Sequence, residues 1–600
     1  MNDFFEHEGL IREADKKEVA AVARTDIFKP MKTASARKRP CECIWVRRWK
    51  WSTDAATQKR SIIVKSRLCV RGYLDPQKWQ LSKHSSTATR LSQKLLVSDC
   101  AVYPDWSMES LDVSNAFLQG FGFKMLEQVC KALGIQLPKV SREVFAIVPG
   151  NVWFLLAELG QEGCPTVGFN MWCLQLVKAM YGLNDGPLMW QLCLRYFYQY
   201  RCSARTSLFD ENHFVWRSET EIWGEATAHV DDNNVAGPES FRLWLRDLLE
   251  SRFGKVGRQE LPMVHVGLTY ERYMSGFRLQ QRSYALTLKL IDITKERAKQ
   301  ADEKCTPEEK HSLHSGVGGL LFLCYTRPDI VVDTLFLQSK VSNPSVSDML
   351  AHNKVVKKAW EFENRGLCFP RLKSPTCVVG YGDASGATKK SCYAIEGRII
   401  VRKEDNLVWQ EEGEFEGKLW NSRCHVLAHS GKKSKRVSQS TSHAESLSHL
   451  TMSFEAELVC MRLTEISAPR PLSLFKMMEL DDEGKYDCYS DLATDCNDLF
   501  ELTTRQNGIP QDKSQRLVIA AIRQHRLMGQ VRAIIKITDR DMVANHLTKQ
   551  ISRQWVFDNL LATGELDFQD TIYYRKSRDL DPMGDCDLDS LWSKQLHAMD

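Results

Sequence analysis

Two neighbouring aspartates, Asp231 and Asp232, are the feature that most constrains the fold of this chain. They lie in AHVDDNNVAG (228–237), after a run of small and apolar residues and before a second run that ends at Gly237. This pattern predicts a strand, a tight turn and a returning strand, with both acids at the turn. Adjacent carboxylates repel each other, so the pair is either solvated or held beside a bound cation. The pattern alone leaves both interpretations open.

The length of 600 residues exceeds what one hydrophobic core accommodates, so several domains are expected. Hydrophobic residues make up 43% of the chain and charged residues 26%, which is typical of globular proteins and argues against wholesale disorder. The net charge is only +5, but residues 32–71 carry twelve Lys and Arg against two acids. Such a segment suits a polyanionic partner, and a solvated basic surface is the alternative.

Targeting and membrane segments are not expected. Residues 1–17 contain acids where a signal peptide would begin with a basic and then an apolar stretch. No window approaches about eighteen consecutive apolar residues. The 19 cysteines lack metal-binding spacing, so reduced thiols and an intracellular compartment are expected, either a cytoplasmic particle or the nucleus.

The hydrophobic pattern predicts several further elements. Helices are expected over 3–24 and 239–253 and from about residue 442, and a basic hairpin over 43–51 and 60–73. A strand running into a helix is expected over 107–120, and a strand followed by a helix over 171–199. Strands that end at acids are expected over 376–383 and 486–491. After residue 551 the pattern loses its periodicity and becomes acidic.

A third strand-end acid, Asp112, follows the apolar residues of SLDV (110–113). Carboxylates brought together from neighbouring strands make a site for Mg²⁺, which prefers hard oxygen ligands, with Mn²⁺ as the alternative ion. Two such ions roughly 4 Å apart activate an attacking hydroxyl and stabilise the leaving oxygen in phosphoryl transfer. The alternative is that each acid is an ordinary turn residue.

Five segments, in the same order, resemble the reverse transcriptase region of the Pol polyprotein of copia-type LTR retrotransposons. They are VKSRLCVRGY (64–73), SLDVSNAFLQG (110–120), REVFAIVPG (142–150), LVKAMYGLNDGPLMW (176–190) and HVDDNNVAG (229–237). A sixth segment, SGVGGLLFLCYTRPDIV (315–331), is similar to a segment beyond the polymerase palm. Several matches in the family's order are far more specific than any one of them.

The resemblance implies a role for individual residues. The three metal-binding catalytic aspartates would be Asp112, Asp231 and Asp232. The aromatic ring under the incoming sugar, which favours dNTPs over rNTPs by its clash with a 2′-hydroxyl, would be Phe117. The residues that grip the triphosphate or the template would be Lys65, Arg67 and Arg71, and those that position template and primer Tyr181 and Gly182. The alternatives are that Phe117 is an ordinary core aromatic and that the basic residues form a solvated face.

Four later segments resemble the RNase H domain of the same elements. They are GYGDASGA (380–387), SQSTSHAESLS (438–448), CYSDLATDCNDL (488–499) and MVANHLTKQ (542–550). The resemblance implies that Asp383, Glu445 and Asp491 hold two metal ions for the cleavage of RNA in RNA–DNA hybrids. The family's fourth aspartate is Asn545 here, which predicts a weakened site unless Asp541 substitutes. The alternative for Asp383 and Asp491 is a strand-end acid that caps the following helix.

Other departures from the family concern the residues around the first set. His229 replaces a tyrosine, and Asn233 and Asn234 replace apolar residues, which predicts a less buried strand. Asn184 and Asp185 introduce an acid where nucleic acid is expected to pass. Three functions remain open: an active enzyme, a degenerate or co-opted remnant that binds nucleic acid without catalysis, and an interaction protein whose acids are turn residues.

The expected fold class is multidomain, α+β and α/β. The resemblance implies a right-hand polymerase with fingers, palm and thumb or connection, followed by an RNase H-like α/β domain. The expected units are an N-terminal helical segment (1–30), fingers and palm (31–255), a thumb- or connection-like region (256–370), the RNase H-like domain (371–550) and a flexible acidic tail (551–600). The expected partners are an RNA template, a DNA primer, RNA–DNA hybrid and dNTPs.

Overall fold

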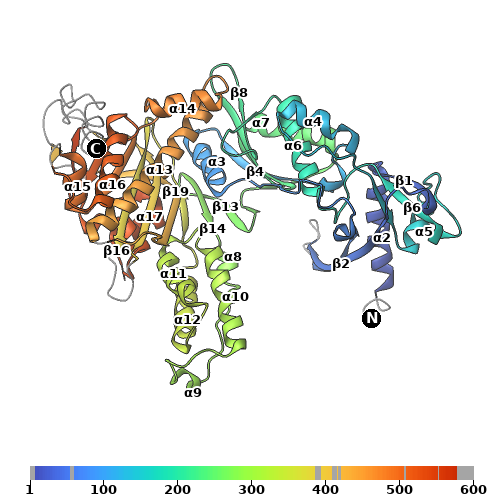
Figure 1. Cartoon of the computed structure of the whole chain (residues 1–600), viewed down its shortest axis with the longest axis horizontal. Helices are drawn as coiled ribbons and strands as arrows, with labels where there is room; N and C mark the ends of the chain where they lie inside the picture. The colour runs from blue at the N-terminus through green and yellow to red at the C-terminus, as the bar shows by residue number, and fades with distance from the viewer. Residues whose placement is uncertain are drawn as a thin grey trace, which may run out of the picture.

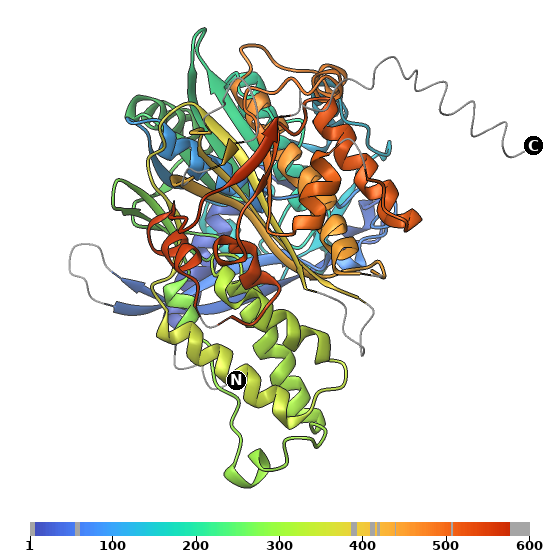
Figure 2. The same cartoon turned by 90° about the vertical axis from the view of Figure 1, so that its left-hand side faces the viewer.

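Four β-sheets organise the computed structural model, which describes residues 7–53, 60–385, 393–407, 415–416, 420–438, 440–505, 508–551 and 553–576. The first sheet lies at one end of the elongated molecule and the fourth at the other, with the second between them (Figure 1). Helices attached to the third sheet project from the side of this body, as both views show (Figures 1 and 2). The predicted multidomain, mixed α/β fold class is therefore confirmed.

The first sheet is built around the predicted basic hairpin. Its strand order is β1 (Phe28–Lys32), β6 (Trp172–Leu176), β5 (Val144–Ile147), β2 (Cys41–Thr53) and β3 (Arg60–Val70). Two helices accompany it, α2 (Glu8–Arg24) and α5 (Gly150–Glu158), whereas α4 (Leu126–Leu133) packs against α6 (Gly186–Arg201). Helix α2, expected over 3–24, binds the hairpin through ion pairs from Arg47 to the buried Asp15 (2.6 Å) and from Arg67 to the buried Glu18 (2.7 Å).

The second sheet carries the paired aspartates. Its strand order is β11 (Val256–Glu260), β4 (Ser107–Val113), β10 (Asp232–Gly237), β9 (Ile222–His229), β8 (His213–Arg217) and β7 (Arg205–Thr206). Its helices are α3 (Arg90–Val102), α6 (Gly186–Arg201) and α7 (Glu239–Phe253). Because side chains alternate along a strand, Leu111 and Val113 join the core with α6 and α7, whereas Met108 joins the core with α3. Asp112 therefore shares the face of Met108.

The third sheet supports the projecting helices. Its strand order is β12 (Met263–His265), β13 (Leu268–Tyr273), β14 (Gly276–Gln280) and β15 (Gly366–Phe369). The helices are α8 (Arg282–Ala285), α9 (Lys295–Ala298), α10 (Pro307–Leu323), α11 (Val331–Lys340) and α12 (Val346–Glu361). Helix α10 begins with a capping box between Thr306 and Glu309, which fixes its first turn.

The fourth sheet contains a parallel centre. Its strand order is β18 (Phe415–Glu416), β23 (Tyr573–Lys576), β21 (Ala533–Lys536), β20 (Ser490–Thr494), β16 (Thr376–Ser385), β17 (Ile395–Glu404), β19 (Ser422–Lys433) and β22 (Glu565–Leu566). Strands β16, β20 and β21 are parallel neighbours. The helices are α13 (Thr441–Ser467), α14 (Leu474–Asp482), α15 (Asn497–Thr504), α16 (Lys513–Leu527) and α17 (Trp555–Thr563). Helix α13 is the long helix expected from about residue 442.

Three sequence expectations need correction. The segment after β4 forms a short 3₁₀ turn over Ala116–Leu118 instead of an α-helix, because Asn115 adopts a left-handed conformation (φ 56°) that interrupts regular winding. The strand expected over 486–491 is β20, so Asp491 lies inside it and not at its end. Residues 553–576, assigned to an acidic tail, form α17, β22 and β23, since Phe557 and Leu560 bury an apolar face of α17. Residues 577–600 lie outside the described part.

The second and fourth sheets are joined by buried polar contacts through α3. Arg402 of β17 lies 2.5 Å from the carboxylate of Asp99 on α3, and Ser98 shares a hydrogen bond of 2.8 Å with His425 of β19. Arg462 of α13 donates to Ser92 at 2.8 Å. Breaking such buried charged contacts is costly, so the two units are expected to move as one body. None of the described helices combines the length and the apolar character needed to cross a bilayer.

Candidate active sites

The first carboxylate set gathers where β4 and the β9–β10 hairpin end. Asp112 and Asp232 are directly opposite each other in the antiparallel pairing of β4 with β10. Asp231 occupies the two-residue turn, and its carbonyl accepts a hydrogen bond of 3.0 Å from the amide of Val113. On the other side of Asp112, β11 presents Gly257, where a Cβ atom would come within 3.3 Å of the Asp112 Cβ. The predicted trio is thus brought together at one end of the sheet.

The turn that carries Asp231 is strained and supported. Val230 has a φ of 62°, a left-handed conformation that a β-branched residue rarely adopts. The indole nitrogen of the buried Trp190 donates a 2.6 Å hydrogen bond to the Val230 carbonyl. Strained conformations persist only where the surroundings hold them, and they concentrate at functional sites.

Mutual repulsion marks the three carboxylates. Burial raises the pKa of Asp112, and the charges of Asp231 and Asp232 raise it further. Burial would also raise the pKa of Asp232, but His265 and Ser110 lower it; Ser110 donates at 2.7 Å, and His265 Nδ1 lies 3.4 Å from Asp232 Oδ2. A divalent cation would relieve this repulsion, and oxygen ligands from neighbouring strands suit Mg²⁺. The residues present therefore fit a metal ion.

Most other residues predicted for this site lie around it. Lys65 on β3 is near enough for the charges of Asp112 and Asp231 to oppose the lowering of its pKa by burial. Phe117 contacts Tyr181 edge to face, with ring centroids 5.7 Å apart. The Arg67 guanidinium lies over the Tyr181 ring at 4.9 Å, while it also binds Glu18.

Two predicted residues have other surroundings. Arg71 forms an ion pair of 2.6 Å with Glu42 on β2, so its charge is already engaged there. Gly182 has a φ of 89°, and a Cβ atom at this position would lie 2.1 Å from the Val70 carbonyl. Only glycine permits this close approach, which lets the Tyr181 carbonyl accept a 2.7 Å hydrogen bond from the Val70 amide.

The two asparagines after the turn do not weaken the burial of β10, contrary to the sequence expectation. Asn233 and Asn234 are both fully buried. The Asn233 amide donates to the carbonyls of Leu111 and Asp231, each at 3.3 Å, and its carbonyl accepts from Tyr198 at 3.1 Å. Asn233 thus ties the turn to β4 and α6 through hydrogen bonds where an apolar residue would use packing alone.

Asp185 does not place a free acid in a nucleic-acid path. It is buried and accepts two hydrogen bonds from Arg142, at 2.9 and 3.1 Å. The Arg142 side chain is only 2% exposed, and a second ion pair of 2.7 Å joins it to the buried Asp75. These ion pairs of Arg142 with Asp75 and Asp185, which we call the Arg142 latch, hold the segment after β3 against the start of α6. On that segment Trp79 is 84% exposed, with the ammonium groups of Lys78 and Lys83 at 5.3 and 5.0 Å from its ring.

The second carboxylate set lies at the carboxyl end of the parallel strands in the fourth sheet. Asp383 belongs to β16, and because Tyr381 is level with Ala493 of β20, Asp383 is level with Asp495 just beyond β20. Glu445, in the first turns of α13, accepts a 3.0 Å hydrogen bond from the Ala384 amide. Ligand atoms of Asp383, Glu445 and Asp495 lie within 4.8 Å of one another. Within the described residues this is the one trio of His, Cys, Asp or Glu that meets this limit.

Asp491 is therefore not the third member of the set, and Asp495 is. Asp491 lies inside β20, is fully buried, and accepts hydrogen bonds from Arg532 at 3.0 and 2.5 Å. The resemblance of CYSDLATDCNDL to the family's segment implied Asp491, the first acid, and the sequence pattern predicted that the strand ends there. The strand ends at Thr494, and the acid after a parallel strand faces the shared carboxyl edge. A predicted strand end three residues later, at Thr494, would have pointed to Asp495.

Burial and like-charge repulsion raise the pKa values of two carboxylates in the second set far above their usual range. Burial, followed by the charges of Asp383 and Asp495, raises the pKa of Glu445 to about 9. Burial, followed by the charge of Asp383, raises the pKa of Asp495 to about 7. Among the described residues, Glu445 Oε2 is buried and has no hydrogen-bond partner. An unpaired buried oxygen beside two further carboxylates fits a divalent cation.

Asn545 and Asp541 have distinct positions. The Asn545 carbonyl accepts a 2.7 Å hydrogen bond from Lys549, whose ammonium also lies 3.2 Å from Asp383 Oδ1. Asp541 accepts backbone amides of Gln569 and Asp570, at 2.9 to 3.2 Å, and so caps the segment before β23. Asp541 does not substitute for the missing carboxylate.

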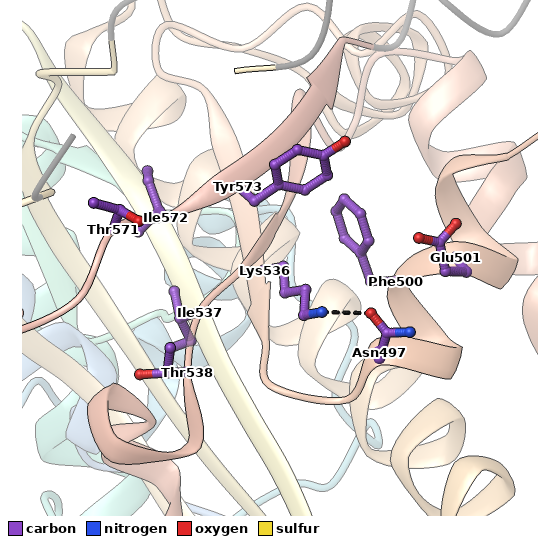
Figure 3. A pocket seen from close by; sticks show the side chains of 9 residues that line it. All are labelled: Asn497, Phe500, Glu501, Lys536, Ile537, Thr538, Thr571, Ile572 and Tyr573. Atoms are coloured by element: carbon purple, nitrogen blue, oxygen red, sulfur yellow. Dashed lines mark hydrogen bonds between the residues drawn. The ribbon is translucent and has the colours of Figure 1, made fainter. Parts of the chain in front are cut away.

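A pocket of about 320 Å³ lies among α15, the end of β21 and the start of β23 (Figure 3), and no carboxylate of the second set lines it. Lys536, which is level with Thr494 of β20, donates a hydrogen bond to Asn497 at the start of α15. The rings of Phe500 and Tyr573 contact edge to face at 5.4 Å on one wall. The pocket thus offers an ammonium group, an amide and aromatic surface, and its Asn497 follows Asp495 by two residues in the chain.

No family model matches the chain. It is similar to the retrovirus-related Pol polyproteins of transposons RE1 and RE2 of Arabidopsis thaliana, 25% identical over 531 residues and 24% over 530, in each case 85% of this chain. It is 21% identical over 407 residues, 63% of this chain, to that of transposon TNT 1-94 of Nicotiana tabacum. The matches span 31%, 31% and 27% of these relatives.

Among solved structures, a foamy viral protease–reverse transcriptase in complex with double-stranded DNA matches 85% of this chain and 66% of its own, with 8% identity and a TM-score of 0.42. The resemblance to copia-type retrotransposon Pol polyproteins, inferred from the sequence motifs, is confirmed by the matches to the three relatives.

Proposed function

We propose that this chain, a relative of retrotransposon Pol polyproteins, is an RNA-directed DNA polymerase joined to an RNase H-like domain. The observation that carries the proposal is the register of Asp112 with Asp232 across β4 and β10, with Asp231 in the strained turn between β9 and β10. Holding three carboxylates together with a strained turn destabilises the fold. A solvated loop would connect the strands without this cost, so the arrangement indicates a functional role.

Under this proposal, each sheet would correspond to one part of such an enzyme. The first sheet with its β2–β3 hairpin would form the fingers, the second sheet the palm, and the third sheet with α8–α12 the thumb or connection. The fourth sheet, with β16, β20 and β21 parallel, would be the RNase H-like domain. The segment between Asp112 and Asp231 includes α4 and α5, and the three carboxylates still meet at the end of β4 and β10.

In the proposed polymerase reaction, divalent cations held by Asp112, Asp231 and Asp232 would supply the charge that activates the primer 3′-hydroxyl and neutralises the triphosphate of a dNTP. Lys65 and Arg67 would contact phosphates from the hairpin above the trio, once Arg67 exchanges Glu18 for substrate. Phe117, braced by Tyr181, would exclude a 2′-hydroxyl. Val230 and Trp190 keep Asp231 in place. The main contribution of this chain to the proposed reaction would therefore be the positioning of the reacting groups.

In the proposed RNase H reaction, Asp383, Glu445 and Asp495 would hold a cation that activates water for cleavage of RNA in an RNA–DNA hybrid. The raised pKa values of Glu445 and Asp495 mean that metal binding must displace protons. The pocket with Lys536, Phe500 and Tyr573 suits a nucleotide, because a cation can meet phosphate while an aromatic ring meets a base.

A nucleic-acid-binding remnant without catalysis is the second candidate. The contact of Lys549 with both Asp383 and Asn545 favours it, since an ammonium group there competes with a divalent cation. The exposed Trp79 between two lysines serves binding whether or not catalysis survives. The two candidates differ in what happens to a primer.

Primer extension on an RNA template distinguishes them. The unmodified chain should extend a DNA primer with Mg²⁺ and dNTPs, and Asp231→Asn should abolish extension while it leaves primer–template affinity unchanged or higher. Asp247→Asn, on the exposed surface of α7, is the matched control and should extend normally. Absence of extension by folded, primer-binding protein would favour the remnant, and absence of both extension and binding would contradict both candidates.

A further inference from the structure

We propose that the ammonium group of Lys549 permanently occupies the place of one of two divalent cations at the second carboxylate set. Asp383, Glu445 and Asp495 would then bind a single divalent ion. This inference rests on the proposed RNase H function of that set, and it replaces the two-ion site that the sequence resemblance implies.

The contacts of Lys549 place its charge between the two positions that a second ion would bridge. Its Nζ atom lies 3.2 Å from Asp383 Oδ1, 2.7 Å from Asn545 Oδ1 and 3.7 Å from Asp539 Oδ1. The other oxygen of Asp383 accepts a hydrogen bond from Thr548. Both Asp383 oxygens are therefore engaged on the side of Asn545.

The orientation of Asn545 is fixed from both ends. Its amide nitrogen donates to the Asp539 carbonyl at 2.9 Å and to the Asp539 carboxylate at 3.0 Å, so its oxygen faces Lys549. An aspartate at position 545 has no hydrogen to donate and would bring a second negative charge beside Asp539. The amide of Asn545 thus suits its neighbours on both sides, and it makes contacts that an aspartate could not make.

The opposite side of Asp383 remains suited to a cation. Glu445 Oε2 is buried and has no partner among the described residues, and it lies in the trio whose ligand atoms are within 4.8 Å of one another. A divalent ion there would be held by three carboxylates. A second divalent ion next to Asn545 would meet the ammonium group of Lys549 at contact distance, and the repulsion between the two cations excludes it.

Counting bound Mn²⁺ by electron paramagnetic resonance tests the inference without any measurement of activity. The full chain carrying Asp112→Asn, Asp231→Asn and Asp232→Asn provides a background in which the first set cannot contribute. In this background we expect one Mn²⁺ per chain, with the spectrum of an isolated ion. Adding Asn545→Asp together with Lys549→Ala should raise the count to two and give the signature of two coupled ions.

Matched controls make the outcomes distinct. Lys536→Ala removes a nearby lysine that binds Asn497 and no member of the trio, and should leave the count at one. Asp383→Asn should remove Mn²⁺ binding. Two ions in the background protein, or one ion in the folded Asn545→Asp/Lys549→Ala protein, would overturn the inference alone. If the background protein shows no Mn²⁺ binding that Asp383→Asn removes, both the inference and the proposed cleavage site are overturned.

Discussion

Asp491 and Arg532 form a buried ion pair, with Arg532 Nη2 2.5 Å from Asp491 Oδ2, between β20 and the residue that precedes β21. Arg532 also binds Asp405 at 2.8 Å, so it joins the loop after β17 to the centre of the sheet. The pair explains why an acid that resembles a metal ligand in sequence serves the fold instead.

Substitutions at Asp491 and Asp495 should therefore have opposite effects. Asp491→Asn should lower the unfolding temperature, because it removes a buried carboxylate that binds Arg532, at a cost of roughly 1.5–3 kcal/mol, the usual contribution of a hydrogen bond to a charged group. It should leave Mn²⁺ affinity unchanged. Asp495→Asn should weaken Mn²⁺ binding and, in EDTA, raise the unfolding temperature, because it removes like-charge repulsion with Asp383. Calorimetry with and without Mn²⁺ measures both, and loss of Mn²⁺ affinity in Asp491→Asn alone would reverse our assignment.

The buried latch of Arg142 should be essential for the stability of the first two sheets. Asp185→Asn removes one of the two carboxylates that balance a 2%-exposed guanidinium, and should destabilise the chain by roughly 3–5 kcal/mol. Asp247→Asn, whose carboxylate is 71% exposed, should change stability by less than about 0.5 kcal/mol. Thermal unfolding followed by circular dichroism compares them, and equal unfolding temperatures would show that the latch contributes nothing.

Trp79 should contribute to the binding of single-stranded nucleic acid. Trp79→Ala should weaken the binding of a short single-stranded RNA by roughly 1–3 kcal/mol, the usual contribution of one stacked base. Lys78→Ala with Lys83→Ala should instead reduce the slope of log affinity against log salt by roughly 1.4, since two phosphate contacts are lost.

Fluorescence anisotropy over a range of salt concentrations separates these two effects. Phe475→Ala on α14, which removes an aromatic ring of comparable exposure (80%), is the control and should bind normally. An unchanged affinity in Trp79→Ala would exclude the proposed stacking surface.

The stability of the chain should decrease as pH rises from about 4 to about 7 because of Asp99 and Glu225. Both carboxyl groups are buried, and burial raises each pKa to about 7; the charge of Glu225 adds to the rise at Asp99, whereas the hydrogen bond with Asp99 lowers the pKa of Glu225. The folded state keeps their protons up to about pH 7, whereas the unfolded chain releases them near pH 4. Between these values the unfolded state binds fewer protons, so the free energy of unfolding falls by about 1.4 kcal/mol per pH unit for each proton retained.

Glu225→Gln should reduce the slope of stability against pH. The substitution removes one of the two titrating carboxyl groups and leaves Asp99 beside Arg402. Urea denaturation at pH 5, 6, 7 and 8 measures the slope. The same slope in the unmodified and the substituted chain would mean that these two groups are not the source.

Local patterns were sufficient for much of the fold. The β2–β3 hairpin, the β9–β10 hairpin, α7 and α13 follow from hydrophobic periodicity, because each buries one face and its period is visible in a short window. Ordered motifs predicted Asp112, Asp231, Asp232, Asp383 and Glu445, and the first three do converge at one end of a sheet. Boundaries were less predictable: β20 ends at Thr494, three residues beyond the predicted end, so the acid that follows the strand is Asp495 and not Asp491.

The sequence by itself determined which residue types are available: paired acids after apolar runs, a basic hairpin, and an asparagine where the family has an aspartate. Only the tertiary structure decided which charges face one another. Asp185 is neutralised by Arg142, Asp491 by Arg532, and Asn545 is oriented by Asp539 and Lys549, all through partners between 4 and 43 residues away in the chain. The reason is physical, because the energy of a carboxylate depends on the charges and solvent within a few ångströms, and sequence spacing does not specify those distances.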